Sequence, residues 1–276
     1  MKLAEIWIYP IKSCQGILVA DHELLATGLK FDRQWMMVKP DGSMLTQREY
    51  PQMARIQLNL NQDLVGLKVS HDEFLELTGT NSKGATPFEV TVWGEKVLGS
   101  VEEDSRVHEF LSDFLQEPVL LVAAGGAFRR FVVEKNSGQK QAQDQPVYFA
   151  DQQPLLITTT QSLSDLNSRL REPVPMSRFR PNLVIDNPEG EPFAEESWQS
   201  LELPDVSISI RQKCARCPIV TSDQLTGQKV SHEPLKTLAG LRREGSKAHF
   251  GMHAWATKTG RVSLGDGVRA LGVGSL

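Results

Sequence analysis

The chain has 276 residues, of which 40% are hydrophobic and 23% are charged, and its formal net charge is −4. These values are ordinary for a soluble protein of one large domain or two closely packed ones. The acidic balance disfavours nucleic acid as the main partner, because domains that bind it carry a basic surface. No apolar run reaches the roughly 18 residues of a membrane span, and Glu5 and Pro10 interrupt any signal-peptide core. We therefore expect a cytoplasmic protein with no membrane and no nucleic-acid partner.

Short runs of alternating apolar residues dominate the first part of the chain. They cover residues 3–9, 17–25, 34–38, 56–60 and 88–97. Turn-forming residues separate them, as at Asp41-Gly42 and Trp93-Gly94. A period of two predicts strands, and many short strands with turns between them predict a barrel or a sandwich.

Helices and strands alternate in the rest of the chain. Apolar residues at helical spacing predict helices at 105–115, with Ser105 as the N-cap, and at 162–170 and 234–243. Strands are predicted at 119–122, 155–158, 182–185 and 206–210, with two more within 252–271. The polar stretch 134–145 predicts a surface loop or a domain linker. The fold class is therefore mainly β with a few helices (α+β).

The three cysteines, Cys14, Cys214 and Cys217, are too few for a disulfide scaffold. Two of them form a Cys-x-x-Cys pair with Ala215 and Arg216 between them. Structural zinc is disfavoured because no second pair follows. A thioredoxin-like redox pair is disfavoured because residues 218–221 look extended rather than helical. The pair remains compatible with a single thiolate presented to a soft metal, its pKa lowered by Arg216 and Lys213, or with a buried, unreactive thiol.

Several basic residues lie beside aromatic residues and prolines where strands begin. They are Lys12, next to Ser13, and Arg33, Arg178 and Arg180. Arginine is suited to bidentate contacts with phosphate, although each of these could be an ordinary surface charge.

A polar segment, residues 151–154, precedes the apolar strand at 155–158. Asp151 and its neighbouring glutamines can hydrogen-bond the edge of a heterocycle, as such groups do with nucleobases. The same residues also favour a simple turn.

Seven segments together resemble one family, in their order and spacing and across nearly the whole chain. They are YPIKSC from Tyr9, FDRQW from Phe31, FADQQPLLI from Phe149, SLSDLNSRL from Ser162, RFRPNLVID from Arg178, CARC from Cys214 and FGMH from Phe250. The sequence resembles MOSC-domain proteins, and among them the branch with an N-terminal β-barrel domain that includes amidoxime-reducing components and bacterial relatives active on N-hydroxylated compounds. The resemblance implies an N-terminal β-barrel-like domain over residues 1–120, packed on a MOSC β-barrel domain over residues 121–276.

The resemblance also implies a molybdenum–molybdopterin cofactor between the two domains. Cys217 would be the protein's ligand to the metal, and Cys214 would be a supporting or structural thiol. Lys12, Ser13 and Arg33 are expected to bind the cofactor's phosphate. Asp151, Arg180 and Asn182 are expected to contact its pterin. The residues expected to surround the metal are Ala215, Arg216, Gly251, Met252 and His253. Arg216 and His253 would orient the substrate or move protons, and so complete the catalytic set with Cys217.

The activity implied by the resemblance is the two-electron reduction of N-hydroxylated small molecules such as hydroxylamines, amidoximes and N-hydroxylated bases. Electrons would come from a separate ferredoxin- or flavoprotein-type donor, because three cysteines cannot supply the four-thiolate pattern of an iron–sulfur cluster. One alternative is a sulfur carrier that works with a pyridoxal-phosphate desulfurase and holds a persulfide on Cys217. Another is a domain that only stores the cofactor.

Overall fold

The largest sheet of the protein joins the two ends of the sequence. In the computed structural model, which describes residues 1–78, 87–132, 145–229 and 231–272, its strands follow the order β19-β14-β15-β17-β12-β13-β1-β2, with β16 paired to β17. The bounds are β1 Lys2–Ile8, β2 Ile17–Val19, β12 Leu155–Thr159, β13 Leu183–Asp186, β14 Trp198–Glu202, β15 Ser207–Ala215, β16 Arg243–Glu244, β17 Lys247–Lys258 and β19 Arg269–Gly272. Neighbours are antiparallel except for β12 and β13, which are parallel and connected through α2 (Thr160–Asn167).

Three smaller sheets accompany the large one in the described part of the chain. One follows the order β5-β11-β10-β9, one β6-β7-β8, and one β18-β3-β4. Their bounds are β3 Asp21–Leu25, β4 Gly28–Leu29, β5 Trp35–Val38, β6 Leu58–Asn61, β7 Leu64–Lys68, β8 Phe74–Glu76, β9 Pro87–Val92, β10 Glu95–Val101, β11 Leu120–Ala123 and β18 Gly260–Ser263. The pairing of β3 with β18 is a second link between the beginning and the end of the chain.

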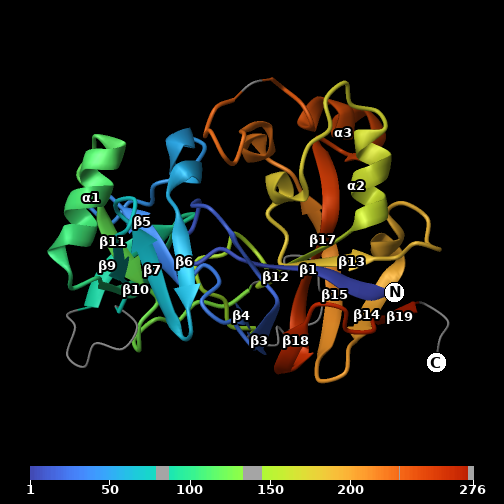
Figure 1. The fold of residues 1–276 in the computed structure, drawn as a ribbon, viewed down its shortest axis with the longest axis horizontal. Helices are drawn as coiled ribbons and strands as arrows, with labels where there is room; N and C mark the ends of the chain where they lie inside the picture. Colours follow the sequence, from blue (N-terminus) through green and yellow to red (C-terminus); the bar gives the residue numbers. More distant parts are fainter. Residues whose placement is uncertain (79–86, 133–144, 230, 273–276) are drawn as a thin grey trace.

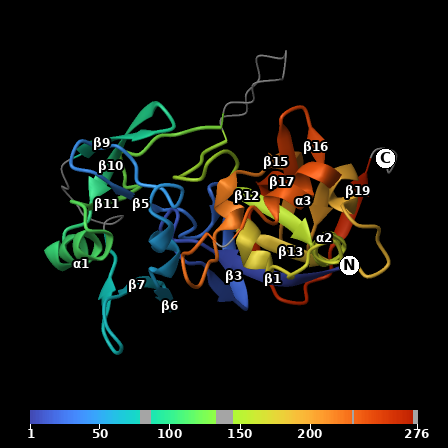
Figure 2. The same cartoon turned by 90° about the horizontal axis from the view of Figure 1, so that it is seen from above.

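The helices cover the outside of two lobes (Figures 1 and 2). The helix α1 (Ser105–Leu115) lies beside the sheet that contains β5, β9, β10 and β11, whereas α2 and α3 (Leu235–Leu241) lie beside the large sheet. Four 3-10 helices connect strands: η1 Pro51–Arg55, η2 Met176–Phe179, η3 Ala194–Ser197 and η4 Pro218–Thr221. None of the helices in the described ranges is long and apolar enough to cross a lipid bilayer.

The predicted class, mainly β with a few helices, is confirmed. The expectation of barrels is not met, because within the described ranges the strands pair as open sheets in which β2 and β19 end the large ladder. Alternation in the sequence predicts which side chains are buried, but it does not encode whether a sheet closes on itself. The expected domain boundary at residue 120 stays a prediction; it falls at the start of β11, which pairs with β5 and β10.

Apolar side chains form a core on each lobe. The large sheet buries Leu3, Ile8, Leu155, Ile208 and other residues in one cluster. A second cluster contains Trp35 and, from the buried face of α1, Leu111. Predicted site residues adjoin both cores in the chain, because Met252 of the first cluster precedes His253 and Ile11 of the second precedes Lys12.

Candidate functional site

A cavity of about 1090 Å³ collects most of the side chains that the sequence predicts to be functional. From the N-terminal segments it receives Lys12, Ser13 and Arg33, and from the C-terminal part it receives Asp151, Arg180, Asn182, Ala215, Arg216, Cys217 and His253. Gly251 and Met252 are not among its lining residues. The strand and loop pairings described above therefore bring together residues that are more than 200 positions apart in the sequence.

One end of the cavity is built around the ammonium group of Lys12. Lys12 is only 6% exposed, and its Nζ donates to the carbonyl of Phe149 at 2.7 Å and forms an ion pair with Asp151. Trp93 Nε1 also donates to Asp151, at 3.0 Å. Burial lowers the pKa of Lys12, and Asp151 opposes that shift. This buried cation is suited to receive an anionic group.

Two guanidinium groups stack on the buried ring of Tyr9. The Cζ atoms of Arg33 and Arg180 lie 4.4 and 4.3 Å from its centroid. Arg33 donates to Asn182 Oδ1 at 3.0 Å and to the carbonyl of Arg180 at 3.1 Å, and so connects the two lobes. Burial lowers the pKa of Arg180 to about 10. The stacking fixes both planar groups at the cavity wall, where they can make directional contacts.

Left-handed backbone conformations recur at this site. Ser13, Arg33, Trp93 and Arg180 have φ values of 69°, 48°, 52° and 54°. Such values are uncommon for residues other than glycine, and the strain that they carry tends to concentrate at functional sites. These conformations could not be predicted from the sequence, because none of the four positions is a glycine.

The end of the cavity that contains Cys217 is the turn that follows β15. Cys217 is partly exposed, lines the cavity and occupies the N-cap position of η4. The residues after it were expected to be extended, but Pro218–Thr221 is a 3-10 helix. Cys214 also lines the cavity but is buried, so Cys217 is the more exposed of the two thiols there, and no cluster of three or more potential metal ligands occurs among the described residues.

Arg216, which was expected beside Cys217, contacts the thiol of Cys214 instead. Arg216 Nη1 is 2.9 Å from Cys214 Sγ, and its Nη2 donates to the carbonyl of Phe179 at 2.7 Å. Lys213 pairs with Glu196 at 2.9 Å and also with Glu244. Arg216 therefore stabilises a negative charge on the first cysteine of the pair.

The strand β17 forms the far wall and brings His253 to the cavity. Met252 is buried in the core of the large sheet, which explains why it does not line the cavity. Gly251 has a φ of 77°, at a place where the β15–β17 register shifts. A Cβ there would lie 2.7 Å from Thr158 Cγ2 and 2.8 Å from the carbonyl of Ile157. Gly251 therefore allows β17 to bulge between Met252, which pairs with Lys213, and His249, which pairs with Ala215.

Replacing Gly251 with alanine is expected to lower the free energy of unfolding by about 1–3 kcal/mol, the usual cost of a strained backbone with a close contact. The matched control is Gly240→Ala in α3, where a Cβ meets nothing within 4 Å. That change should stabilise the helix by roughly 0.5–1 kcal/mol. Urea unfolding of both variants measures the difference, and equal effects would contradict the role assigned to Gly251.

Several side chains that line the cavity were not predicted from the sequence, among them Arg48, Trp93 and Arg130. Arg48 stacks on Trp93, with 4.6 Å between its Cζ and the ring centroid, and Trp93 lies in the turn between β9 and β10. Arg130 pairs with Glu95 at 3.0 Å. The sequence predicted only a turn at Trp93. A large aromatic residue in a tight turn was the available signal, because a turn does not require one. Arg178, in contrast, pairs with Asp223 at 2.9 Å and does not line the cavity.

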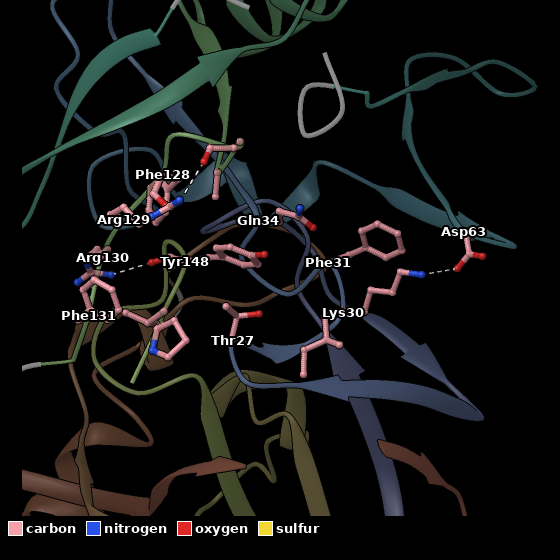
Figure 3. Close-up of a pocket in the computed structure, with 16 residues that line it drawn as sticks. Thr27, Lys30, Phe31, Gln34, Asp63, Phe128, Arg129, Arg130, Phe131 and Tyr148 are labelled. Carbon is pink, nitrogen blue, oxygen red and sulfur yellow. Dashed lines mark hydrogen bonds and ion pairs between the residues drawn. The ribbon is translucent and has the colours of Figure 1, made fainter. Parts of the chain in front are cut away.

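A second cavity of about 770 Å³ shares Arg130 and Phe131 with the first. Figure 3 shows it between Phe31, Tyr148 and Phe128, with Lys30 joined to Asp63 at 2.8 Å. None of the predicted site residues lines it. The first cavity is therefore the candidate functional site.

Two family models match the chain. A family model described as the MOSC N-terminal beta barrel domain matches residues 1–118, and one described as the MOSC domain matches residues 144–269. The human protein named mitochondrial amidoxime-reducing component 1 is 31% identical over 98% of this chain and 83% of its own length. The rice molybdenum cofactor sulfurase is 32% identical over 91% of this chain, which spans about a third (32%) of that protein.

Likeness to solved structures is weaker. The crystal structure of YiiM from Geobacillus stearothermophilus is 13% identical and gives a TM-score of 0.33, with 45% of this chain and 58% of that chain covered.

Proposed function

Because the chain belongs to the MOSC family, with both the N-terminal beta barrel domain and the MOSC domain, we propose that it binds a molybdenum–molybdopterin cofactor and reduces N-hydroxylated compounds. The substrates would be hydroxylamines, amidoximes or N-hydroxylated bases, and a separate protein would donate the electrons. The names of its relatives support this direction, since they refer to amidoxime reduction and to the molybdenum cofactor. The proposal is carried by one observation, which is the grouping of buried cations, polar side chains and one accessible thiol around a single cavity.

The residues of the cavity fit such a cofactor. Gln153 Oε1, Arg216 Nε and His253 Nδ1 are buried without a hydrogen-bond partner among the described residues, and all three residues line the cavity. Buried polar atoms are usually satisfied, so these atoms indicate that a polar ligand completes the site. Lys12 and Arg33 would hold the phosphate, and Asp151 and Asn182 would hydrogen-bond the pterin. The Cys217 thiolate would hold the metal, because molybdenum with sulfur ligands favours a further soft ligand.

The reaction converts R–NHOH, two electrons and two protons into R–NH2 and water. The bound cofactor would supply the two electrons to the N–O bond. Arg216 and His253 line the same cavity as Cys217, so they are placed to orient the substrate there and to deliver a proton. Tyr9 fixes Arg33 and Arg180 at the cavity wall, so the cofactor would be held in one orientation.

The proposal is tested with protein purified from a host that makes the cofactor. We expect close to one molybdenum per chain, together with released pterin, and reduction of a simple hydroxylamine by an artificial electron donor. Absence of molybdenum from folded protein would overturn the proposal. A labile sulfur on Cys217 under those conditions would favour the sulfur carrier, for which the sulfurase relative is the supporting observation.

A further inference from the structure

Cys214 is a buried thiol surrounded by cationic and hydrogen-bonding groups. It lies near the end of β15, with Arg216 Nη1 2.9 Å from its Sγ. His253, on the neighbouring strand β17, also hydrogen-bonds Cys214. Burial alone would raise the pKa of this thiol, but Arg216 and His253 outweigh it and lower the pKa to about 6.

Cys14 is a useful contrast within the same chain. It is fully buried, and burial raises the pKa of its thiol far above the ordinary value, although Arg180 opposes the shift. The two thiols differ in their partners, because only Cys214 accepts a hydrogen bond from a guanidinium group. The low pKa of Cys214 therefore reflects its particular partners rather than burial.

His253 connects this thiol to the cavity. It is 8% exposed and lines the cavity, and its Nδ1 has no hydrogen-bond partner among the described residues. The bond to Cys214 therefore uses the other ring nitrogen, and the Nδ1 side of the ring is available to a ligand.

Other charged or titratable groups lie on the same two strands or across the cavity, and Lys213 among them is paired with Glu196 and Glu244. These groups are Arg211 and Lys213 on β15, Lys247 and His249 on β17, and Arg180 and Asp151 across the cavity. Asp151 is paired with Lys12, so its charge is largely compensated.

We propose that Cys214 is a positioning residue whose thiolate, held by Arg216, fixes the ring of His253 so that His253 gives a proton to the oxygen leaving the substrate. The proposal rests on the proposed reductase function. The N–O bond breaks, the two electrons come from the donor protein, and the oxygen leaves as water. His253 supplies one of the two protons, solvent in the cavity supplies the other, and solvent then reprotonates His253.

The first test measures the thiolate itself and does not depend on activity. In the Cys217→Ser background only Cys14 and Cys214 remain, and Cys14 stays protonated near neutral pH. The ultraviolet absorbance of thiolate should then titrate as a single group with a midpoint near 6. It should disappear in Cys217→Ser/Cys214→Ser and persist in Cys217→Ser/Cys14→Ser. A midpoint in the ordinary thiol range, above about 8, overturns the proposal.

The second test follows the imidazole and the kinetics in the loaded protein. A hydrogen-bonded ring N–H of His253 should be visible by NMR in the wild type and absent in Cys214→Ala, and Cys214→Ser should restore part of it. We expect kcat to fall about 100-fold in His253→Ala, the low end for loss of a general acid. It should fall roughly 10-fold in Cys214→Ala, as for other residues that orient a functional group, with KM little changed.

The two proposals fail in different ways. Wild-type kcat and an unchanged pH profile in Cys214→Ala would overturn the role of Cys214 while reductase activity stood. A wild-type protein without reductase activity, but with the low thiolate midpoint and the ring N–H signal, would count against the reductase function and still support the Cys214–His253 pair.

Discussion

Replacing Cys217 with serine is expected to yield a folded protein that has lost almost all of its molybdenum and its reductase activity. The reason is the chemistry of the ligand, since a hydroxyl is a hard and protonated group where a soft thiolate is needed. Cys217 is partly exposed and forms no disulfide, so the loss should not reflect unfolding. We expect activity to fall more than about 100-fold, beyond the usual effect of changing a residue next to a ligand.

The matched control for this variant is Cys14→Ser, which removes a thiol from the same protein outside the cavity. Metal analysis of both purified variants, each normalised to folded protein, compares the two cysteines directly. Cys14→Ser should retain the metal content of the wild type. Full molybdenum content in Cys217→Ser would show that the metal is held elsewhere and would contradict the assignment.

Replacing Arg33 with methionine is expected to destabilise the fold by about 3–5 kcal/mol, because it leaves a buried carboxylate without its partner. Arg33 Nη1 lies 2.5 Å from Asp32 Oδ2, and both side chains are mostly buried. The double variant Asp32→Asn/Arg33→Met should recover much of the loss, since the amide can still accept the hydrogen bond from the Tyr9 backbone N–H. The control is Lys96→Met, whose pair with Glu89 is exposed and should be worth less than about 1 kcal/mol.

The loss of stability in Arg33→Met should also depend on pH and should be larger at higher pH. Burial raises the pKa of Asp32 in the folded protein, although Arg33 opposes the shift. An acid whose pKa is raised by folding binds more protons in the folded state, so its contribution to stability falls as pH rises. Without Arg33 the pKa should rise further. Urea unfolding should therefore show Arg33→Met to be less destabilised at pH near 5 than near 7, and the opposite trend would contradict the buried-pair interpretation.

Local features of the fold could be predicted from the sequence. The helix at 105–115 is correct because its apolar spacing is a local signal, although Asp104 rather than Ser105 provides the N-cap. The strand at 252 begins five residues earlier in the structure, at Lys247, because Gly251 bulges within it. The pairing of β1 with β13 could not be predicted, since alternation shows which face is buried but does not identify the partner strand.

The candidate site, like the fold, could be predicted only in part from the sequence. Its residues could be named from short motifs because their order in the chain is characteristic, and the structure places most of them around one cavity. The partner of Arg216 was missed, although alternation offered a signal. Residues two apart in an extended segment share a face, so Arg216 lies on the side of Cys214 rather than of Cys217. Arg48 and Trp93 were missed because their stacking depends on two segments that only the tertiary fold brings together.

The interleaving of the two ends of the chain has a consequence for synthesis. The strand β1 cannot find β13, nor β3 its partner β18, until the ribosome has made most of the protein. At ordinary elongation rates this delay is on the order of ten seconds or more. During that time Lys12 and Arg33 have emerged while Arg180 and Cys217 have not yet been made. The nascent chain therefore has no complete pocket, and a ligand that needs both groups of residues can bind only after most of the chain has been made.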